Sequence, residues 1–309
     1  NQDRSIESRQ LVDKFVNTRT FRIVGEVQSV EELSRAIREG KAYVGLQIPP
    51  DFTRNYVAGR GAQVQVLIDG SSSTIALQAL QTSMGLALRE SMLTLMQQAH
   101  ATEMPIEVRP QILYNPTMKS ANFFVPGVMG IALQIATVFA TALSVVREKE
   151  RGTLENLLVA PLSRPALMLG KLTPYLLISM TMATCIFAMA RWVFGIPIRG
   201  DLGALFAAAL LYVFALLSLG LLISTRAQNH MQALQMTMAL LLPAVFFSGF
   251  IFPIETMPRF FQWSSAAMPA TYFIELMRAI MLRGAGIAEY WRHYVILGGM
   301  GVGLFGLCA

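Results

Sequence analysis

A charged segment between two long apolar runs holds the side chains best suited to chemistry or to docking. Arg147 and Glu150 are three residues apart, as are Glu148 and Arg151, so each pair would meet on the face of a continuing helix. Gly152 would break that helix, and a second, short amphipathic helix would follow. The residues concerned are Arg147, Glu148, Glu150, Arg151, Gly152, Thr153, Leu154, Glu155, Leu157 and Leu158. The pattern is typical of a surface that binds another protein, and equally of a solvated loop whose arginines extend along the membrane surface.

Catalytic and nucleotide-binding motifs are missing from the sequence. The serines at 71–73 lie outside any GxSxG frame, so we expect them to cap a helix. His100, His230 and His293 are far apart in sequence, which argues against a metal site. No GxxxxGK[ST] phosphate loop occurs. We therefore expect this chain to bind no metal and no cofactor, and not to bind ATP in the usual way.

Composition divides the chain at about residue 122. The 309 residues carry a net charge of 25 − 19 = +6, with 54% hydrophobic and 14% charged residues, against about 25% charged in an average soluble domain. Residues 1–122 hold 13 Lys/Arg and 12 Asp/Glu, whereas the longer remainder holds 12 and 7. This predicts a soluble domain at 1–122 and a membrane domain at 123–309. Because the positive charge forms no basic run, we expect no nucleic-acid partner.

Five uncharged apolar runs follow, at residues 123–146, 172–190, 202–225, 231–254 and 294–309. A run of 24 residues covers about 36 Å as a helix, enough for a hydrocarbon core of about 30 Å. The last run has 16 residues and is short for a span. We expect both chain ends to be truncated, with at least one apolar segment missing upstream. Lys and Arg counts in alternate loops tie, so they leave the orientation open.

Residues 1–122 alternate helix and strand patterns and predict a small α/β domain. Helices are expected at 5–17, 29–38, 52–59 and from 71–74 to about 100, and strands at 21–27, 41–48, 63–68 and 106–113. The long helix carries an apolar face at helical spacing, made of Leu77, Leu80, Met84, Leu88, Met92, Leu95 and Ala99. Such a face normally packs against a core.

Residues 255–282 predict neither a span nor an ordinary loop. Pro253, Pro258 and Pro269 interrupt helices, while the aromatic residues between them are too apolar for a free loop. We expect two short helices that enter the outer leaflet, where Glu275 and Arg278 would pair with each other or face water. An interfacial loop with an aromatic belt is the alternative.

Several blocks of sequence resemble one family, in register along the whole chain. Residues 147–165 resemble its coupling-helix signature, and the other blocks are 3–5, 43–52, 66–70, 124–127, 242–258 and 269–273. The family is that of the type-two ABC exporter permeases, in their bacterial drug-efflux branch. Relative to the family pattern, this sequence lacks the first span and the end of the sixth.

The resemblance implies an α-helical polytopic membrane protein with an inserted α/β extracytoplasmic domain and outer re-entrant helices. Six spans are implied in the full chain, five of them visible here. The loop 147–171 would be cytoplasmic and would contact an ABC ATPase, separate or fused upstream, that binds ATP and Mg. The domain 1–122 would lie on the periplasmic side of the bacterial inner membrane. Further implied partners are a second permease copy or a paralogue, a periplasmic adaptor and an outer-membrane channel.

The implied function is export of an amphipathic organic substrate, drug-like or lipid-like, with no enzymatic activity in this chain. Candidate pathway or outer-gate residues are Met236, Phe246, Phe247, Phe250, Glu275 and Arg278. A stripe of Met and aromatic residues also fits simple helix packing. Two other function classes stay open: a secondary transporter, and a membrane-anchored periplasmic sensor or structural protein. The four long runs carry no Asp, Glu, Lys, Arg or His, which argues against coupling to ions.

Overall fold

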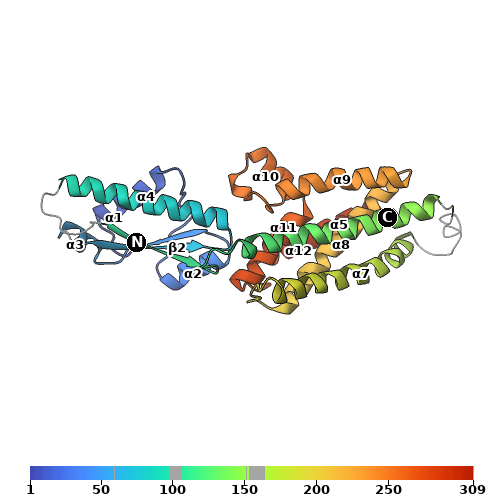
Figure 1. The fold of residues 1–309 in the computed structure, drawn as a ribbon, viewed down its shortest axis with the longest axis horizontal. Helices are drawn as coiled ribbons and strands as arrows, with labels where there is room; N and C mark the ends of the chain where they lie inside the picture. Colours follow the sequence, from blue (N-terminus) through green and yellow to red (C-terminus); the bar gives the residue numbers. More distant parts are fainter. Residues whose placement is uncertain (59, 98–105, 151, 153–163, 309) are drawn as a thin grey trace. The chain divides into compact units, whose positions relative to one another are not determined.

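The computed structural model describes residues 1–58, 60–97, 106–150, 152 and 164–308. The chain divides into two compact units, Asn1–Ser120 and Ala121–Ala309, here called unit 1 and unit 2. Figure 1 follows their elements in colour from blue at the N-terminus to red at the C-terminus.

Unit 1 holds a three-stranded sheet flanked by helices. Its strands are β1 (Val44–Gln47), β2 (Ala62–Asp69) and β3 (Ile106–Leu113), in the order β1-β2-β3, with β1 antiparallel and β3 parallel to β2. Its helices are α1 (Ile6–Asn17), α2 (Val30–Arg38), α3 (Phe52–Val57) and α4 (Ser73–Gln97). The helix starts predicted at Ser5 and Ser29 are confirmed, because each serine side chain accepts a hydrogen bond from a backbone N–H three residues on. Helix α4 provides the crossover that the parallel pair β2–β3 requires.

The strand predicted at residues 21–27 is wrong. This segment forms no strand in the described chain, and Ile23 and Val24 are 54% and 62% exposed. High β-propensity describes a fit to a pleated, half-buried surface, and it produces a strand only where a neighbouring strand supplies hydrogen bonds.

The apolar face predicted for the long helix is not the face that packs on the sheet. Leu77, Met84, Leu88 and Met92 of α4 are between 47% and 52% exposed. The buried positions of α4 include Ala76, Ala79, Ser83 and Leu86, and the alanines and Leu86 share a core with Val64 and Val66 of β2. Small side chains at the first three positions let the helix lie close to the sheet. The larger apolar residues are left on the outer face.

We expect Leu86→Ala to destabilise unit 1 by about 2–4 kcal/mol, because it leaves a cavity against the sheet. Leu88→Ala, the matched control on the outer face of the same helix, should change stability by less than about 0.5 kcal/mol. Amide hydrogen exchange of β2 in the full chain measures both changes. Equal effects of the two substitutions would contradict the orientation of α4.

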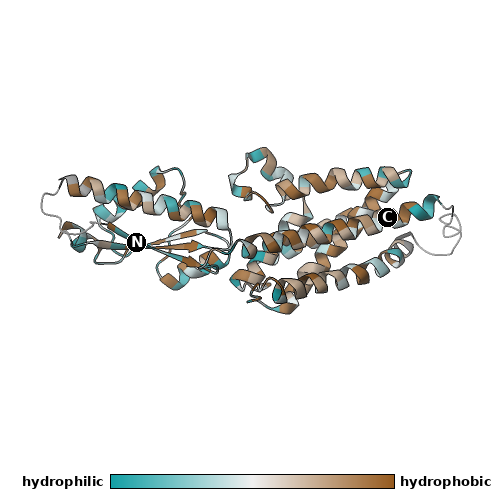
Figure 2. Ribbon diagram, in the orientation of Figure 1, coloured by the Kyte–Doolittle hydropathy of each residue, from teal (hydrophilic) through white to brown (hydrophobic). Residues whose placement is uncertain are grey.

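Unit 2 is built from long apolar helices, brown along most of their length in Figure 2. They are α5 (Ser120–Glu150), α7 (Arg164–Trp192), α8 (Leu202–Arg226), α9 (His230–Phe247) and α12 (Trp291–Gly306). In the described residues, four helices are long and apolar enough to cross a membrane: α5, the Met168–Trp192 part of α7, α8 and α9. Helix α12, with 16 residues, is shorter than these four. Helix α8 lies at the centre, with Tyr212, Leu216 and Leu217 fully buried.

The two short helices expected within residues 255–282 are confirmed. They are α10 (Arg259–Ala266) and α11 (Pro269–Arg278), preceded by the 3-10 turn η1 (Ile254–Thr256) and followed by the π-helical turn η2 (Ala279–Arg283). Helix α11 packs inside unit 2, where Phe273 stacks on Tyr212 with the ring centroids 4.1 Å apart. Helix α10 instead exposes Phe260 and Trp263.

Candidate functional site

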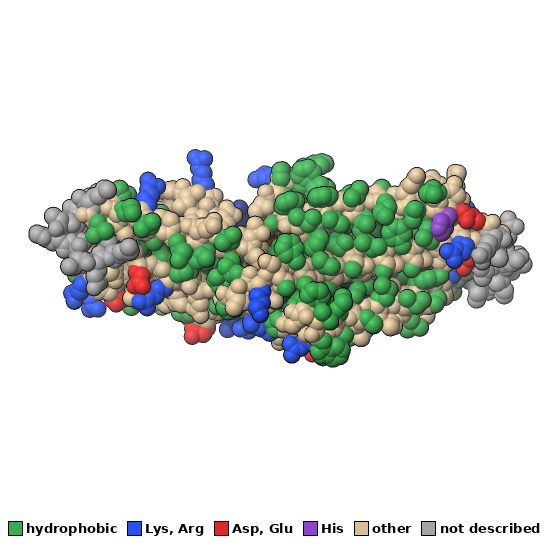
Figure 3. Space-filling view, viewed as in Figure 1, with side chains coloured by type: hydrophobic (Ala, Val, Ile, Leu, Met, Phe, Trp, Pro, Cys, Tyr) green, Lys and Arg blue, Asp and Glu red, His purple; other side chains and the backbone are tan. Residues whose placement is uncertain are grey.

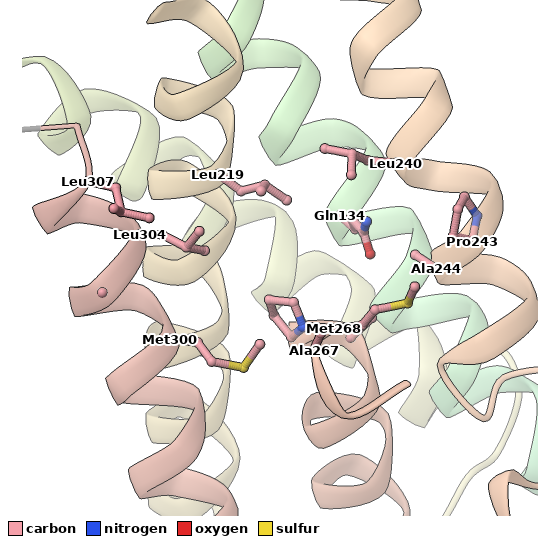
Figure 4. A pocket seen from close by; sticks show the side chains of 13 residues that line it. Gln134, Leu219, Leu240, Pro243, Ala244, Ala267, Met268, Met300, Leu304 and Leu307 are labelled. Carbon is pink, nitrogen blue, oxygen red and sulfur yellow. The ribbon is translucent and has the colours of Figure 1, made fainter. Parts of the chain in front are cut away.

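A half-open apolar cavity of about 410 Å³ lies among α5, α8, α9, α12, the turn before α11 and the first two residues of α11 (Figure 4). Leu240, Pro243 and Ala244 form its α9 wall, and Met300 lines it from α12. Among the described residues, its one polar lining side chain is Gln134 of α5. The Gln134 Oε1 atom lies 3.4 Å from the Tyr212 hydroxyl, which donates at 3.0 Å to the carbonyl oxygen of Gly130. A largely apolar cavity with one amide suits a ligand that is mostly apolar and carries a polar group.

The predicted pathway residues on and after α9 are not among the described residues that line this cavity. Phe247 stacks on Phe261 of α10, with the ring centroids 4.8 Å apart. Phe246 is 46% exposed and Met236 is partly buried against the core of unit 2. The aromatic and Met residues chosen from the sequence are therefore not those of the cavity, whose lining includes Met268 and Met300 instead. The signal that could have found it is Gln134, an amide in the middle of a 24-residue uncharged run.

Phe250, just after α9, packs against the first turns of α5. A Cβ atom placed on Gly127 would lie 2.3 Å from a ring carbon of Phe250, so this position requires glycine. The rings of Phe124 and Phe250 meet edge to face, with centroids 6.4 Å apart. Phe250 is thus a predicted pathway residue that makes a tight contact between α5 and the segment after α9.

The two predicted gate charges, Glu275 and Arg278, tie α11 to different neighbours. Glu275 lies 3.0 Å from Nε2 of His293, at the start of α12. Arg278 donates to the carbonyl oxygen of Gly249 at 3.0 Å and to those of Phe123 and Phe250 at 3.5 Å. Its guanidinium also lies 4.1 Å from the centroid of the Phe123 ring.

The last turn of α5 carries the described part of the predicted coupling segment. Glu148 forms an ion pair with Lys171 of α7, Lys149 donates to the carbonyl of Ala227 at 3.2 Å, and Glu150 accepts from the backbone N–H of His230 at 2.7 Å. Charged and histidine side chains gather at this end of unit 2 in Figure 3.

Of the other predicted coupling residues, Arg147 and Gly152 are described in the structure. Arg147 is exposed, and Gly152 has a φ of +70°, which favours glycine. Arg151, Thr153, Leu154, Glu155, Leu157 and Leu158 lie outside the described residues. Within the described residues, Glu148 reaches α7 and Glu150 reaches α9, elements that follow later in the chain; the predicted pair of Glu148 with Arg151 lies outside these residues.

Comparison with known proteins gives the chain its family. Residues 1–309 match the ABC-2 family transporter proteins. The chain is 29% identical to the probable multidrug ABC transporter permease YbhR of Escherichia coli K12, over 94% of this chain and 78% of that protein. It is 32% identical to the probable multidrug ABC transporter permease YbhS of the same organism, over 82% and 68%. It is 28% identical to the inner membrane transport permease YhhJ, also of E. coli K12, over 97% and 81%. The protein therefore belongs to the ABC-2 family of transporter proteins.

Proposed function

We propose that this chain is the permease subunit of an ATP-binding-cassette exporter that moves an amphipathic organic substrate, drug-like or lipid-like, out of the cytoplasm or the inner membrane. The observation that carries the proposal is the cavity of about 410 Å³, a size within the usual range for small-molecule sites. Its apolar wall would hold the hydrophobic part of a substrate, and the Gln134 amide would meet a polar group.

The energy comes from a partner. ABC-2 permeases work with an ABC ATPase, and this sequence holds no phosphate loop. ATP and Mg are therefore assigned to the ATPase, whether it is a separate subunit or fused upstream. Closure of the ATPase would push the loop 147–171 and tilt the spans. Two permease halves, identical or paralogous, would enclose the pathway, and a periplasmic adaptor and an outer-membrane channel would carry the substrate onward.

The orientation follows from the same proposal. The end of unit 2 that carries Glu148, Lys149 and Lys171 faces the cytoplasm, where the ATPase binds. Residues 1–122 lie in the periplasm, and residues 255–282 form the outer gate. The packing of Phe250 on Gly127 supports a closed state at the outer end, because it leaves no room for a side chain between α5 and the segment after α9.

Co-purification tests the partner directly. An affinity-tagged full-length chain should retain an ABC ATPase through purification in mild detergent, with ATP hydrolysis in the eluate. The control is the Gln134→Leu variant, which changes the cavity and should retain the ATPase equally well. A tagged chain that transports along an ion gradient with no ATPase bound would support a secondary transporter instead.

A further inference from the structure

Helix α9 is the least buried of the four candidate spans. Only 17% of its apolar window is buried inside the described chain, against 61% for α8. Its fully buried side chains are those of Ala233, Thr237 and Ala244. A helix with few buried contacts moves at lower free-energy cost than a central one. Figure 1 shows α9 along one side of unit 2.

The first turn of α9 is tied to the last turn of α5. Glu150 accepts a hydrogen bond of 2.7 Å from the backbone N–H of His230, the first residue of α9. Asn229 caps the same turn by accepting from the N–H of Gln232 at 2.8 Å. A carboxylate at a helix N-terminus is favoured by the helix dipole. Lys149, next to Glu150, donates a hydrogen bond to the carbonyl oxygen of Ala227, which lies just before this turn.

The other end of α9 is tied to the start of α5 through Arg278. The guanidinium donates to the carbonyls of Gly249 and Phe250, which follow α9, and to that of Phe123 in the first turn of α5. A cation at these carbonyls again complements the dipole of α9. The cavity lined by Gln134 of α5 and by Leu240 of α9 lies between the two ties.

We infer that Glu150 and Arg278 are positioning residues that couple α9 to α5 at both ends, so that a displacement of the end of α5 moves α9 and reshapes the cavity. The inference rests on the proposed function, because the displacement is supplied by the ATPase acting on the loop that follows Glu150. Glu150 transmits the movement at the cytoplasmic end. Arg278 holds the outer end in place, so α9 tilts rather than slides.

The test follows one cysteine in the cavity wall. Leu240→Cys is introduced into a chain with Cys185→Ser and Cys308→Ser, since Leu240 lines the cavity and is 42% exposed. The permease is purified with its ATPase, and the rate of maleimide labelling is compared without nucleotide and with ATP plus vanadate. We expect the two labelling rates to differ by about fivefold. A charge interaction at one helix end shifts the ratio of two conformations by about this factor.

At the cytoplasmic tie, Glu150→Ala should reduce this difference to less than about twofold. Glu150→Gln should retain most of it, because an amide oxygen still accepts from His230. Both variants should fold, since Glu150 is exposed. The control is Arg226→Ala, an exposed charge at the end of α8, which should leave the difference unchanged.

At the outer tie, Arg278→Leu should raise the labelling rate without nucleotide. Arg278→Lys, which keeps the charge, should raise this rate by a smaller factor. It can be measured even if the leucine variant does not fold. Arg259→Ala, an exposed charge at the start of α10, is the control.

The outcomes separate the inference from the proposed function. The inference alone is overturned if the parent protein shows ATP-driven transport, its nucleotide response survives Glu150→Ala, and Arg278→Leu leaves the labelling rate without nucleotide unchanged. A parent protein without ATP-driven transport overturns the proposed function, and the inference with it.

Discussion

Export should be abolished in a chain that carries Glu155→Arg together with Leu158→Asp, while the chain remains folded and inserted. Both residues belong to the segment that resembles the family's coupling helix, and both lie outside the described residues. Leu158→Asp places a charge on the apolar face predicted to bind the ATPase, and burying it there would cost several kcal/mol. A loss of about 3 kcal/mol lowers affinity roughly 100-fold. Efflux from cells and retention of the ATPase measure the loss.

The control for this prediction is Asn156→Ala, which changes the opposite side of the same predicted helix and should leave export intact. Normal export in the double variant would remove the assignment of residues 153–158 to coupling. Loss of the chain from the membrane fraction would be a folding defect and is checked on the same samples.

Gly127→Val should break the closure at the outer end of unit 2. A Cβ atom at this position would lie 2.3 Å from a Phe250 ring carbon, so the ring or helix α5 must move, at a cost of about 1–3 kcal/mol. The expected result is leakage of a fluorescent amphipathic dye through purified, reconstituted protein in the absence of ATP.

Gly170→Val is the matched control for that substitution. Gly170 is also in a long helix, α7, but no atom of the described part of the chain lies within 4 Å of a Cβ atom placed there. The same β-branched residue should therefore cause no leak. Equal leakage from both valine variants would show that the effect is a general weakening of helices and not the loss of a seal.

Local signals predicted much of the fold. The caps at Ser5 and Ser29 and the two short helices after Pro258 could be recognised because helix starts and breaks depend on neighbouring residues. The orientation of α4 could not, because this helix has apolar residues on more than one face and small residues decide which face approaches the sheet. The error at residues 21–27 has a related cause, since strand formation depends on a distant partner.

The candidate site shows the same limit. Spacing within 147–151 suggested pairs along one helix, but Glu150 bonds to His230, 80 residues further along the chain. Arg278 likewise reaches Phe123, 155 residues away. Such contacts depend on how the helices pack, and no spacing in the sequence encodes them. The charges were recognised as functional candidates, whereas their partners required the structure.

Transport in proteoliposomes shows whether this chain forms a pathway driven by ATP hydrolysis in a partner. The permease and its co-purified ATPase are reconstituted with the ATPase facing outward, and uptake of an amphipathic fluorescent dye is followed. We expect uptake that requires both ATP and Mg and that stops in the Glu155→Arg, Leu158→Asp variant. Uptake that proceeds without ATP and follows an imposed ion gradient would contradict this expectation.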